Sequence, residues 1–536
     1  MKPLPRSSFA LVLAAAMLAP SFAATFPPGT VLSPRQEMIR NNFAEPNSLD
    51  PALVGGGNSS NIVLDLFEPL VALDHHSQAV PGAAESWRQA DPTTWVFKLR
   101  KGALWSDGEP VTAQDFVYAW RRLLDPKTGA MLAVSNASFI LNGLAINEGK
   151  LPPSALGARA IDATTLEVKT TGPLPFVPML MTNPVLAPVP RGVIEKAGSA
   201  WTRPGTLVGN GAYVLKAWQV NSKVVVEKNP KYWDAANVQL TKVTYLAVED
   251  GNADLKLYQS GEEDMMSRLP AGTFAALKAQ FPKELHFSRL IGLRYHALNN
   301  ADPLLKDVRV RQALSMVIDR ELLASRVTAE GELPTYGLTL AGSEGVDPVR
   351  YEWADWTMDK RVAEAKKLLA AAGVRPGTRL RFMVDMSDLQ KRIAVFTASE
   401  WKTKLGLETD LDTVEYKVMY QKMHDGDFQA GRAGWVASTA DITDMLDVVQ
   451  CGHDANVNKS CDKAADALIA QARVQVDPAR RRQLLTQAVR QAMDAYPMVP
   501  LLQYAQSRLV KPWIGGYEDA NDQGLYRSKD FYVIKH

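Results

Sequence analysis

The chain has 536 residues, of which 46% are hydrophobic and 22% are charged, with 60 basic and 58 acidic side chains. This length is too great for one hydrophobic core and predicts about two to four domains of roughly 100–200 residues each. The nearly balanced charge argues against nucleic acid as a partner, because surfaces that bind nucleic acid are usually strongly basic.

The first residues have the pattern of a secretory signal peptide. Lys2 and Arg6 give a positive start, residues 9–19 are apolar, and residues 21–23 place small side chains where a signal peptidase cleaves. The apolar run is shorter than the roughly 20 residues that span a bilayer, and no cysteine follows it for a lipid anchor. We therefore expect cleavage near Ala23 and a soluble, exported product. Without Lys2 and Arg6, basic and acidic residues are equal at 58, so the mature chain is formally neutral.

Short β-rich segments alternate with amphipathic helical segments along the chain, which predicts an α/β fold. Residues 94–99, 223–227 and 242–246 alternate between apolar and polar side chains in the manner of strands. Thr112 and Asp115 resemble a capping box at the start of a helix that ends before the Asp-Pro pair at 125–126. Its predicted buried face carries Phe116, Trp120 and Leu123.

Two later helices have clear boundaries. Residues 361–372 are rich in strong helix formers and are followed by Gly373, a typical residue after a helix end. Asp477 and Pro478 form an N-cap and first helical position, and this helix should continue to about Ala495.

The chain contains two cysteines, Cys451 and Cys461, within a polar segment. In an exported protein, two cysteines ten positions apart favour a disulfide. The alternatives are two free thiols, or a metal site that includes His453.

Several long sequence strings carry a family resemblance. They are AESW at 84–87, LRKGALWSDGEPVTAQDFVYAWRR at 99–122, NGAYVLKAW at 210–218, YQSGEEDM at 258–265, DVRVRQALSMVIDR at 307–320 and RLVKPWIGGY at 508–517. Together they resemble the periplasmic oligopeptide-binding proteins of ABC importers, in the peptide and nickel class of solute-binding proteins. The resemblance runs from about Asn41 to the C-terminal residues.

This resemblance implies an α/β fold similar to the type II periplasmic binding proteins, with two main lobes joined by a hinge and an additional inserted lobe. Lobe I would comprise residues 24–57, 187–289 and 506–536. Lobe II would be inserted into it at residues 58–186, and lobe III would comprise residues 290–505. The resemblance also implies a monomer that closes over a peptide and delivers it to an ABC permease in the inner membrane, with no cofactor.

The resemblance assigns ligand contacts to two segments. An extended peptide would pair with the backbone at Glu45 to Asn47 and at Gly434, Trp435 and Val436. Arg432 would hold the peptide carboxylate, because a guanidinium stays charged and matches a carboxylate with two parallel hydrogen bonds. A salt bridge within the protein is the alternative role for Arg432.

Other positions depart from the family pattern. The family has an aspartate for the peptide ammonium group where this chain has Ser438, and Asp441 could replace it only if the loop were reshaped. Gln390 replaces a histidine, Met423 an arginine and His296 an acidic residue. The remaining candidate ligand contacts are Tyr416 and Tyr504. These changes give weight to a murein peptide, a blocked peptide or another carboxylated solute as the ligand.

An exported hydrolase is the main alternative from another class. The Gly-Ser-Glu-Gly segment at 342–345 is not the GxSxG motif of a nucleophilic serine. The Asp-His-His segment at 74–76 predicts a solvated turn, and the glycines at 55–57 predict a flexible connection without the lysine of a phosphate loop. We therefore expect a binding protein and not an enzyme.

Overall fold

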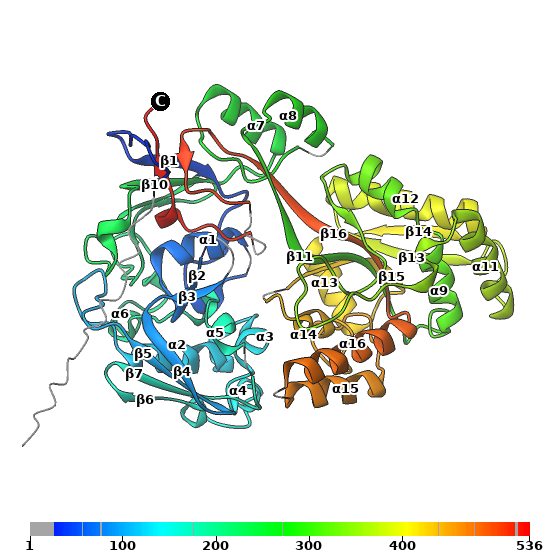
Figure 1. The fold of residues 1–536 in the computed structure, drawn as a ribbon, viewed down its shortest axis with the longest axis horizontal. Helices are drawn as coiled ribbons and strands as arrows, with labels where there is room; N and C mark the ends of the chain where they lie inside the picture. Colours follow the sequence, from blue (N-terminus) through cyan, green and yellow to red (C-terminus); the bar gives the residue numbers. More distant parts are fainter. Residues whose placement is uncertain are drawn as a thin grey trace, which may run out of the picture.

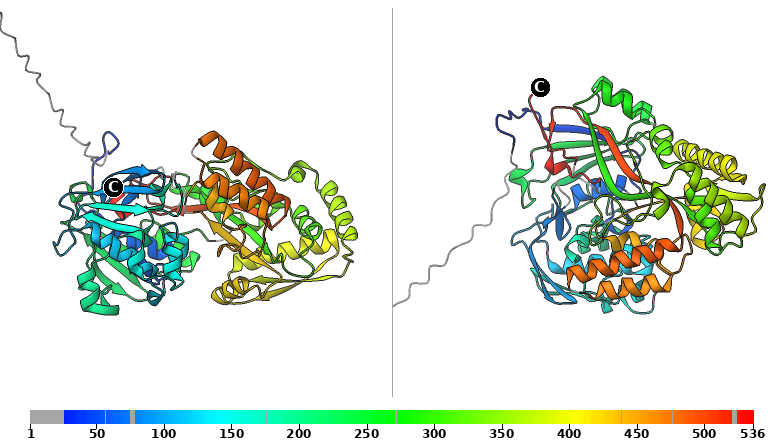
Figure 2. Two further views of the ribbon diagram at one scale, coloured as in Figure 1. Left: turned by 90° about the horizontal axis from the view of Figure 1, so that it is seen from below. Right: turned by 45° about the vertical axis from the view of Figure 1, so that its right-hand side comes forward.

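The computed structural model describes residues 26–536, except residues 56, 75–77, 175, 271, 438, 476 and 520–523 and the side chain of residue 417. The predicted signal peptide lies outside this range. Figures 1 and 2 show two bodies connected by two long strands. None of the helices in the described ranges has both the length and the apolar character needed to cross a membrane.

The first body contains two four-stranded sheets. One has the order β1 (Glu37–Asn41), β10 (Lys242–Leu246), β9 (Lys223–Lys228) and β8 (Tyr213–Gln219). In this sheet β1 is parallel to β10, which joins segments about 200 residues apart, while the other pairs are antiparallel. The second sheet is antiparallel throughout, with the order β4 (Ala84–Asp91), β5 (Thr94–Leu99), β7 (Thr165–Lys169) and β6 (Ala158–Asp162).

Helix α2 (Ala113–Leu124) packs against the second sheet and has the predicted start and end. The Thr112 backbone N–H donates to the Asp115 carboxylate at 2.8 Å, which confirms the capping box. Phe116, Trp120 and Leu123 are buried, as expected from their spacing. This helix, which lies in one of the sequence strings that resemble the family, therefore has a structural role in the first body.

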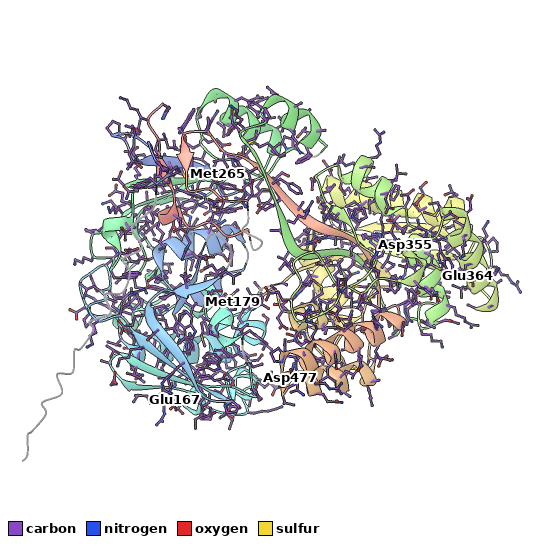
Figure 3. All side chains as sticks on the ribbon, viewed as in Figure 1. Glu167, Met179, Met265, Asp355, Glu364 and Asp477 are labelled. Atoms are coloured by element: carbon purple, nitrogen blue, oxygen red, sulfur yellow. A yellow bond between two sulfur atoms is a disulfide. The ribbon has the colours of Figure 1, made fainter. Side chains whose placement is uncertain are left out.

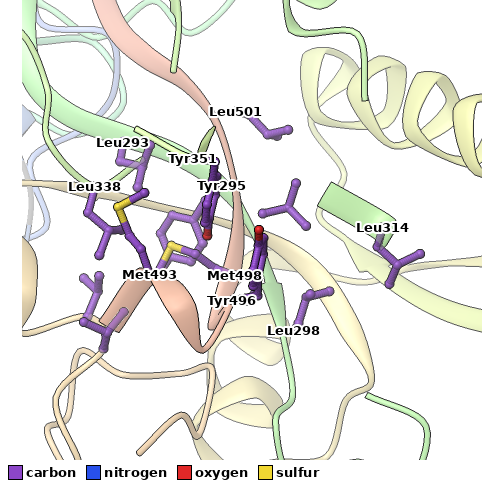
Figure 4. Close-up of a cluster of buried hydrophobic side chains, with 14 of the residues drawn as sticks. Leu293, Tyr295, Leu298, Leu314, Leu338, Tyr351, Met493, Tyr496, Met498 and Leu501 are labelled. Atoms are coloured by element: carbon purple, nitrogen blue, oxygen red, sulfur yellow. The ribbon is translucent and has the colours of Figure 1, made fainter. Parts of the chain in front are cut away.

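The second body is built on a six-stranded mixed sheet. Its order is β12 (Leu333–Pro334), β16 (Met498–Leu509), β11 (Leu285–Leu298), β15 (Ala430–Val436), β13 (Arg379–Val384) and β14 (Glu408–Thr413). Figure 4 shows part of its core, in which buried leucine, tyrosine and methionine side chains such as Tyr295 and Leu501 gather beside β11 and β16.

The remaining elements are mostly helices. They are α1 (Gly57–Leu66), α3 (Ala133–Ala137), α4 (Gly143–Asn147), α5 (Val177–Leu180), α6 (Arg191–Ala197), α7 (Gly251–Ser260), α8 (Phe274–Gln280), α9 (Val308–Met316), α10 (Arg320–Leu322), α11 (Met358–Ala371), α12 (Asp388–Leu405), α13 (Tyr416–Asp425), α14 (Ile442–Leu446), α15 (Lys463–Arg473) and α16 (Pro478–Asp494), with the short strands β2 (Val71–Leu73), β3 (Ala79–Pro81), β17 (Ile514–Gly515) and β18 (Tyr532–Val533).

The predicted strands and helices are found close to their expected boundaries. The predicted strands correspond to β5, β9 and β10. Helix α16 begins at Pro478 with Asp477 as its N-cap. Helix α11 begins earlier than expected, at Met358, because Thr357 caps it through the Lys360 backbone N–H. Gly373 follows its end with a φ of 74°, a conformation that glycine adopts without strain.

Strands β11 and β16 run from one body into the other (Figure 1). Their antiparallel register is interrupted between Arg289 and Leu293, where three residues of β11 face one residue of β16. Two strands with a local break in their ladder are a suitable place for bending between the bodies. The buried core of the second body extends from Ile291 to Leu502, and a separate core that both sheets of the first body share extends from Met38 to Val533. The three-lobe division remains a prediction.

Candidate ligand-binding site

A large cavity lies between the two bodies and has a volume of about 1030 Å³. This is at the upper end of the range for small-molecule sites. Figure 3 shows Met179, one of the lining residues, on the side of the first body that faces the second. Most of the lining residues fall within four groups. They are 41–43, 54–61 and 249–274 of the first body, 132–136 and 179–185 of the same body, the connecting strands at Leu290, Arg294 and 504–508, and 387–390 with Val436 and Ala437 of the second body. Glu330, Gly524 and Leu525 complete the lining.

The edge of β15 provides unpaired backbone beside this cavity. β15 pairs with β11 along its length, but with β13 only at Ala430 and Gly431. From Arg432 to Val436, the other edge of β15 has no strand partner in the described part of the chain. Val436 is 46% exposed and lines the cavity. An extended ligand could therefore add to the sheet as a further strand.

Gly434 has a steric reason for lacking a side chain. A Cβ atom at this position would overlap the hydroxyl oxygen of Tyr504, which projects from β16. Tyr504 lines the cavity, and its ring centroid lies 4.7 Å from the guanidinium carbon of Arg294. The structure thus places Gly434 against Tyr504, and both Val436 and Tyr504 line the cavity.

Trp435 has an anchoring role in this strand. Its indole N–H donates to the Asp444 carboxylate of α14 at 2.8 Å, and its ring packs against the core of the second body. Trp435 therefore fixes the end of β15, while the backbone beside it stays accessible.

Arg432 forms an ion pair with Asp385, which follows the last residue of β13. The Tyr416 ring centroid lies 4.8 Å from the guanidinium carbon of Arg432. Arg432 and Tyr416 do not line the cavity, and Asp385 was not predicted from the sequence. The protein salt bridge considered as an alternative for Arg432 is therefore present. Asp385 bonds to Nη2, and a guanidinium has five N–H donors, so further donors remain, including a buried Nε that has no partner among the described residues.

Ser438 lies outside the described residues. The nearby Asp441 is fully engaged: its carboxylate accepts two hydrogen bonds from Arg481, at 2.7 and 3.0 Å, and caps α14 through the Thr443 backbone N–H. Two hydrogen bonds from a guanidinium and one from a helix start leave this carboxylate little capacity for a ligand. In this structure the Asp441 carboxylate therefore serves contacts within the protein.

The side chains of Glu45 and Asn47 stabilise their own segment. Glu45 accepts hydrogen bonds from the Trp218 indole at 2.6 Å and the Asn221 backbone at 2.9 Å. Asn47 donates to the Leu53 carbonyl and accepts from the backbone N–H of Gly55. Neither residue lines the cavity, so a ligand contact there would be made by backbone or after closure of the two bodies.

His296 does not reach the cavity, contrary to the expectation from the sequence. It is buried beneath α12, where its Nε2 lies 2.8 Å from the Thr397 hydroxyl and its ring contacts Phe382 and Trp401. Burial lowers the pKa of His296 to about 3, so it is neutral. Met423 is likewise buried in the core. Of the substituted positions, Gln390, in the first turn of α12, lines the cavity.

Three arginines that the sequence interpretation did not include line the cavity: Arg268, Arg294 and Arg508. Arg294 is paired with Glu332 at 2.9 Å, and both side chains are buried. Glu330, also in the lining, has its pKa raised by burial and by the neighbouring Glu332. A charged residue in the apolar run of β11 was the available sequence signal for Arg294.

Cys451 and Cys461 form a disulfide, as predicted. It lies away from the residues that line the cavity. Within the described ranges, no three His, Cys, Asp or Glu side chains are grouped so that they could hold a metal ion.

Comparison with known proteins identifies the family. Residues 78–456 match the family described as bacterial extracellular solute-binding proteins, family 5 Middle. The chain is 39% identical to the periplasmic oligopeptide-binding protein OppA of Escherichia coli over 99% of both chains. It is 37% identical to the periplasmic murein peptide-binding protein MppA of E. coli, with 96% of both chains covered. The protein belongs to the family 5 bacterial extracellular solute-binding proteins.

Solved structures agree with this assignment. OppA of Burkholderia pseudomallei is 45% identical and has a TM-score of 0.86, with 94% of this chain and all of that chain covered. OppA of Haemophilus influenzae, in complex with the peptide RPPGFSPFR, is 34% identical and has a TM-score of 0.85, with the same coverage. The fold is therefore that of the type II periplasmic binding proteins.

Proposed function

We propose that this protein is the periplasmic solute-binding component of an ABC importer, and that it captures oligopeptides between its two bodies and delivers them to a membrane permease. The observation that carries the proposal is the unpaired edge of β15 beside a large cavity. Backbone pairing along such an edge holds peptides of different sequence, because it uses groups that every peptide has.

The cavity suits the side chains of varied peptides. It is wide, and its lining mixes asparagines and arginines with apolar residues such as Leu132, Met179 and Leu180. Polar walls of this kind can contact a ligand through water, which adapts to different side chains. The irregular β11–β16 ladder would then allow the bodies to close over the ligand.

Arg432 is proposed as the anchor for the ligand carboxylate. Because some of its donors have no partner among the described residues, Arg432 can donate to a second carboxylate at the β15 edge. No equivalent anchor is proposed for a ligand ammonium group, since Asp441 is bound to Arg481. Ligands with a blocked or displaced amino group are therefore compatible with the site. A murein peptide is the second candidate, supported by the engagement of Asp441 and by the similarity to a murein peptide-binding protein.

The proposal has three further parts. The protein is exported through a signal peptide at residues 1–23, it acts as a monomer, and it captures its ligand without catalysis. The relatives are named as periplasmic binding proteins and not as enzymes, which supports a receptor. Ligand contacts by Glu45, Asn47, Gln390, Tyr416 and Ser438 also belong to the proposal.

Native mass spectrometry of the protein purified from the periplasm tests this function. We expect a monomer that starts near residue 24 and carries co-purifying peptides, which are released on denaturation. Protein refolded without ligand should bind alanine peptides of three to five residues in calorimetry. Folded protein that binds none of these peptides and releases a different class of solute would overturn the proposal.

A further inference from the structure

Arg508 and Arg268 are two cavity-lining cations without an acidic partner. Arg508 lies on β16, and Arg268 lies in the segment that precedes α8. In the described part of the chain, no carboxylate is within ion-pair distance of either side chain. Arg294, in contrast, has Glu332 as its partner in the same wall. Arg508 and Arg268 therefore differ from Arg294, which has a carboxylate partner.

Arg508 is held in place but not neutralised. Its side chain is buried, at 5% exposure, with the guanidinium carbon 4.6 Å from the Tyr526 ring centroid. Nη2 donates to the Gly524 carbonyl at 3.4 Å, a long hydrogen bond, and the buried Nε has no partner among the described residues. A buried cation with a missing hydrogen bond is costly, so a ligand anion at this position would be strongly favoured.

Arg268 belongs to a segment that runs beside the end of β16, because the Met266 backbone N–H donates to the Leu509 carbonyl at 3.0 Å, one residue from Arg508. The guanidinium carbon of Arg268 is 3.9 Å from the Phe43 ring centroid. Two guanidinium groups from adjacent segments of one cavity wall repel each other, and an anion between them would relieve this repulsion.

We propose that Arg508 and Arg268 form a second carboxylate subsite, which takes the acidic side chain of a bound peptide. This inference rests on the proposed peptide-binding function. The preference for an anion is local to this subsite, because Glu249, Glu330 and Asp388 also line the cavity and offset the positive charge of its arginines. The subsite lies on the connecting strand and the first body, whereas Arg432 lies on β15 of the second body. The favoured ligand therefore carries two carboxylates, one at its end and one on a side chain.

Calorimetry with refolded, ligand-free protein tests the subsite. The probes are alanine peptides of three to five residues in which each position in turn is replaced by Glu or by the neutral Gln. At one position the Glu peptide should bind at least about tenfold more tightly than its Gln partner, the effect of one good charge-assisted hydrogen-bond pair. Arg508→Gln and Arg268→Gln should each remove most of this preference.

The control variant is Arg289→Gln, because Arg289 is exposed on β11 and does not line the cavity. It should keep the full Glu preference. Arg268→Gln changes an exposed position and keeps the test valid if Arg508→Gln unfolds. Equal binding of Glu and Gln peptides at every position would overturn the subsite and leave the proposed function intact. Failure of all peptides to bind the folded protein would overturn both.

Discussion

Arg432 and Asp385 form an ion pair that joins two parallel neighbouring strands, β15 and β13, at the point where their pairing ends. The arginine that the family resemblance assigns to the ligand carboxylate therefore already has a carboxylate of the protein beside it. A ligand carboxylate held by Arg432, as proposed, would share the guanidinium with Asp385, so the charge of Asp385 would oppose binding while its position orients Arg432.

This relationship predicts the effect of Asp385→Asn. The amide keeps a hydrogen-bonding group beside Arg432 but removes the negative charge, so peptides with a free carboxylate should bind up to about tenfold more tightly. Amidated peptides should be unaffected, and the unfolding free energy should fall by about 1–3 kcal/mol because the arginine loses its ionic partner. Calorimetry and urea unfolding measure the two effects. Weaker binding of both peptide forms would mean that Asp385 contributes a direct ligand contact.

Gly434→Ala tests the close approach to Tyr504. The added methyl group would overlap the tyrosine hydroxyl, so we expect weaker peptide binding and a loss of about 1–3 kcal/mol in stability. Adding Tyr504→Phe should restore much of the peptide affinity and of the stability, since it removes the overlapping oxygen. Gly192→Ala in α6 is the matched control, because a Cβ there meets no neighbour. If the double variant is no better than Gly434→Ala, the overlap is not the cause.

Local sequence patterns predicted the regular elements because their causes are local. Asp115 and Asp477 cap helices by accepting hydrogen bonds from backbone N–H groups only two or three positions away in the sequence. Strands β5 and β10 follow a simple alternation of apolar and polar side chains. The Arg432–Asp385 pair had no such signal. It depends on β13 and β15 becoming neighbours, although 47 residues separate the two side chains in the chain.

His296 illustrates the same limit. The resemblance placed His296 among the candidate ligand contacts, and Arg294, two residues earlier on β11, does line the cavity. The packing of Thr397 and Trp401 of α12 over His296 decides that this side chain belongs to the core. Side-chain identity alone could not distinguish these two environments.

The burial of His296 predicts a pH effect on stability. Its pKa is lowered to about 3 in the folded protein, below the usual value of 6.5, so the unfolded chain binds the extra proton first as the pH falls. The stability that His296 contributes is present above about pH 6.5 and is lost towards pH 3. Between pH 6.5 and 4.5 this amounts to about 2–3 kcal/mol.

Urea unfolding at both pH values measures this contribution. His296→Gln should reduce the loss of stability between pH 6.5 and 4.5, whereas His536→Gln, at an exposed position, should leave it unchanged. An identical pH dependence in His296→Gln and the unmodified protein would show that His296 is protonated in the folded state.

Loss of the disulfide should destabilise the protein without affecting ligand affinity. Replacing Cys451 and Cys461 by serine removes a short covalent loop, at a cost of about 3 kcal/mol in the chain-entropy model. Peptide affinity should stay the same because the loop does not line the cavity. Chemical unfolding and calorimetry of the double variant check both statements. A large loss of affinity in the folded variant would connect this loop to the site.

The central claim is that the peptide's carboxylate, held by Arg432, matters more than its amino group. Calorimetry with three matched alanine peptides, one free, one amidated at its C-terminus and one acetylated at its N-terminus, tests it most directly. Amidation should weaken binding at least about tenfold, since it removes a charge-assisted contact, and acetylation should weaken it less than about threefold. A larger loss on acetylation than on amidation would contradict this account.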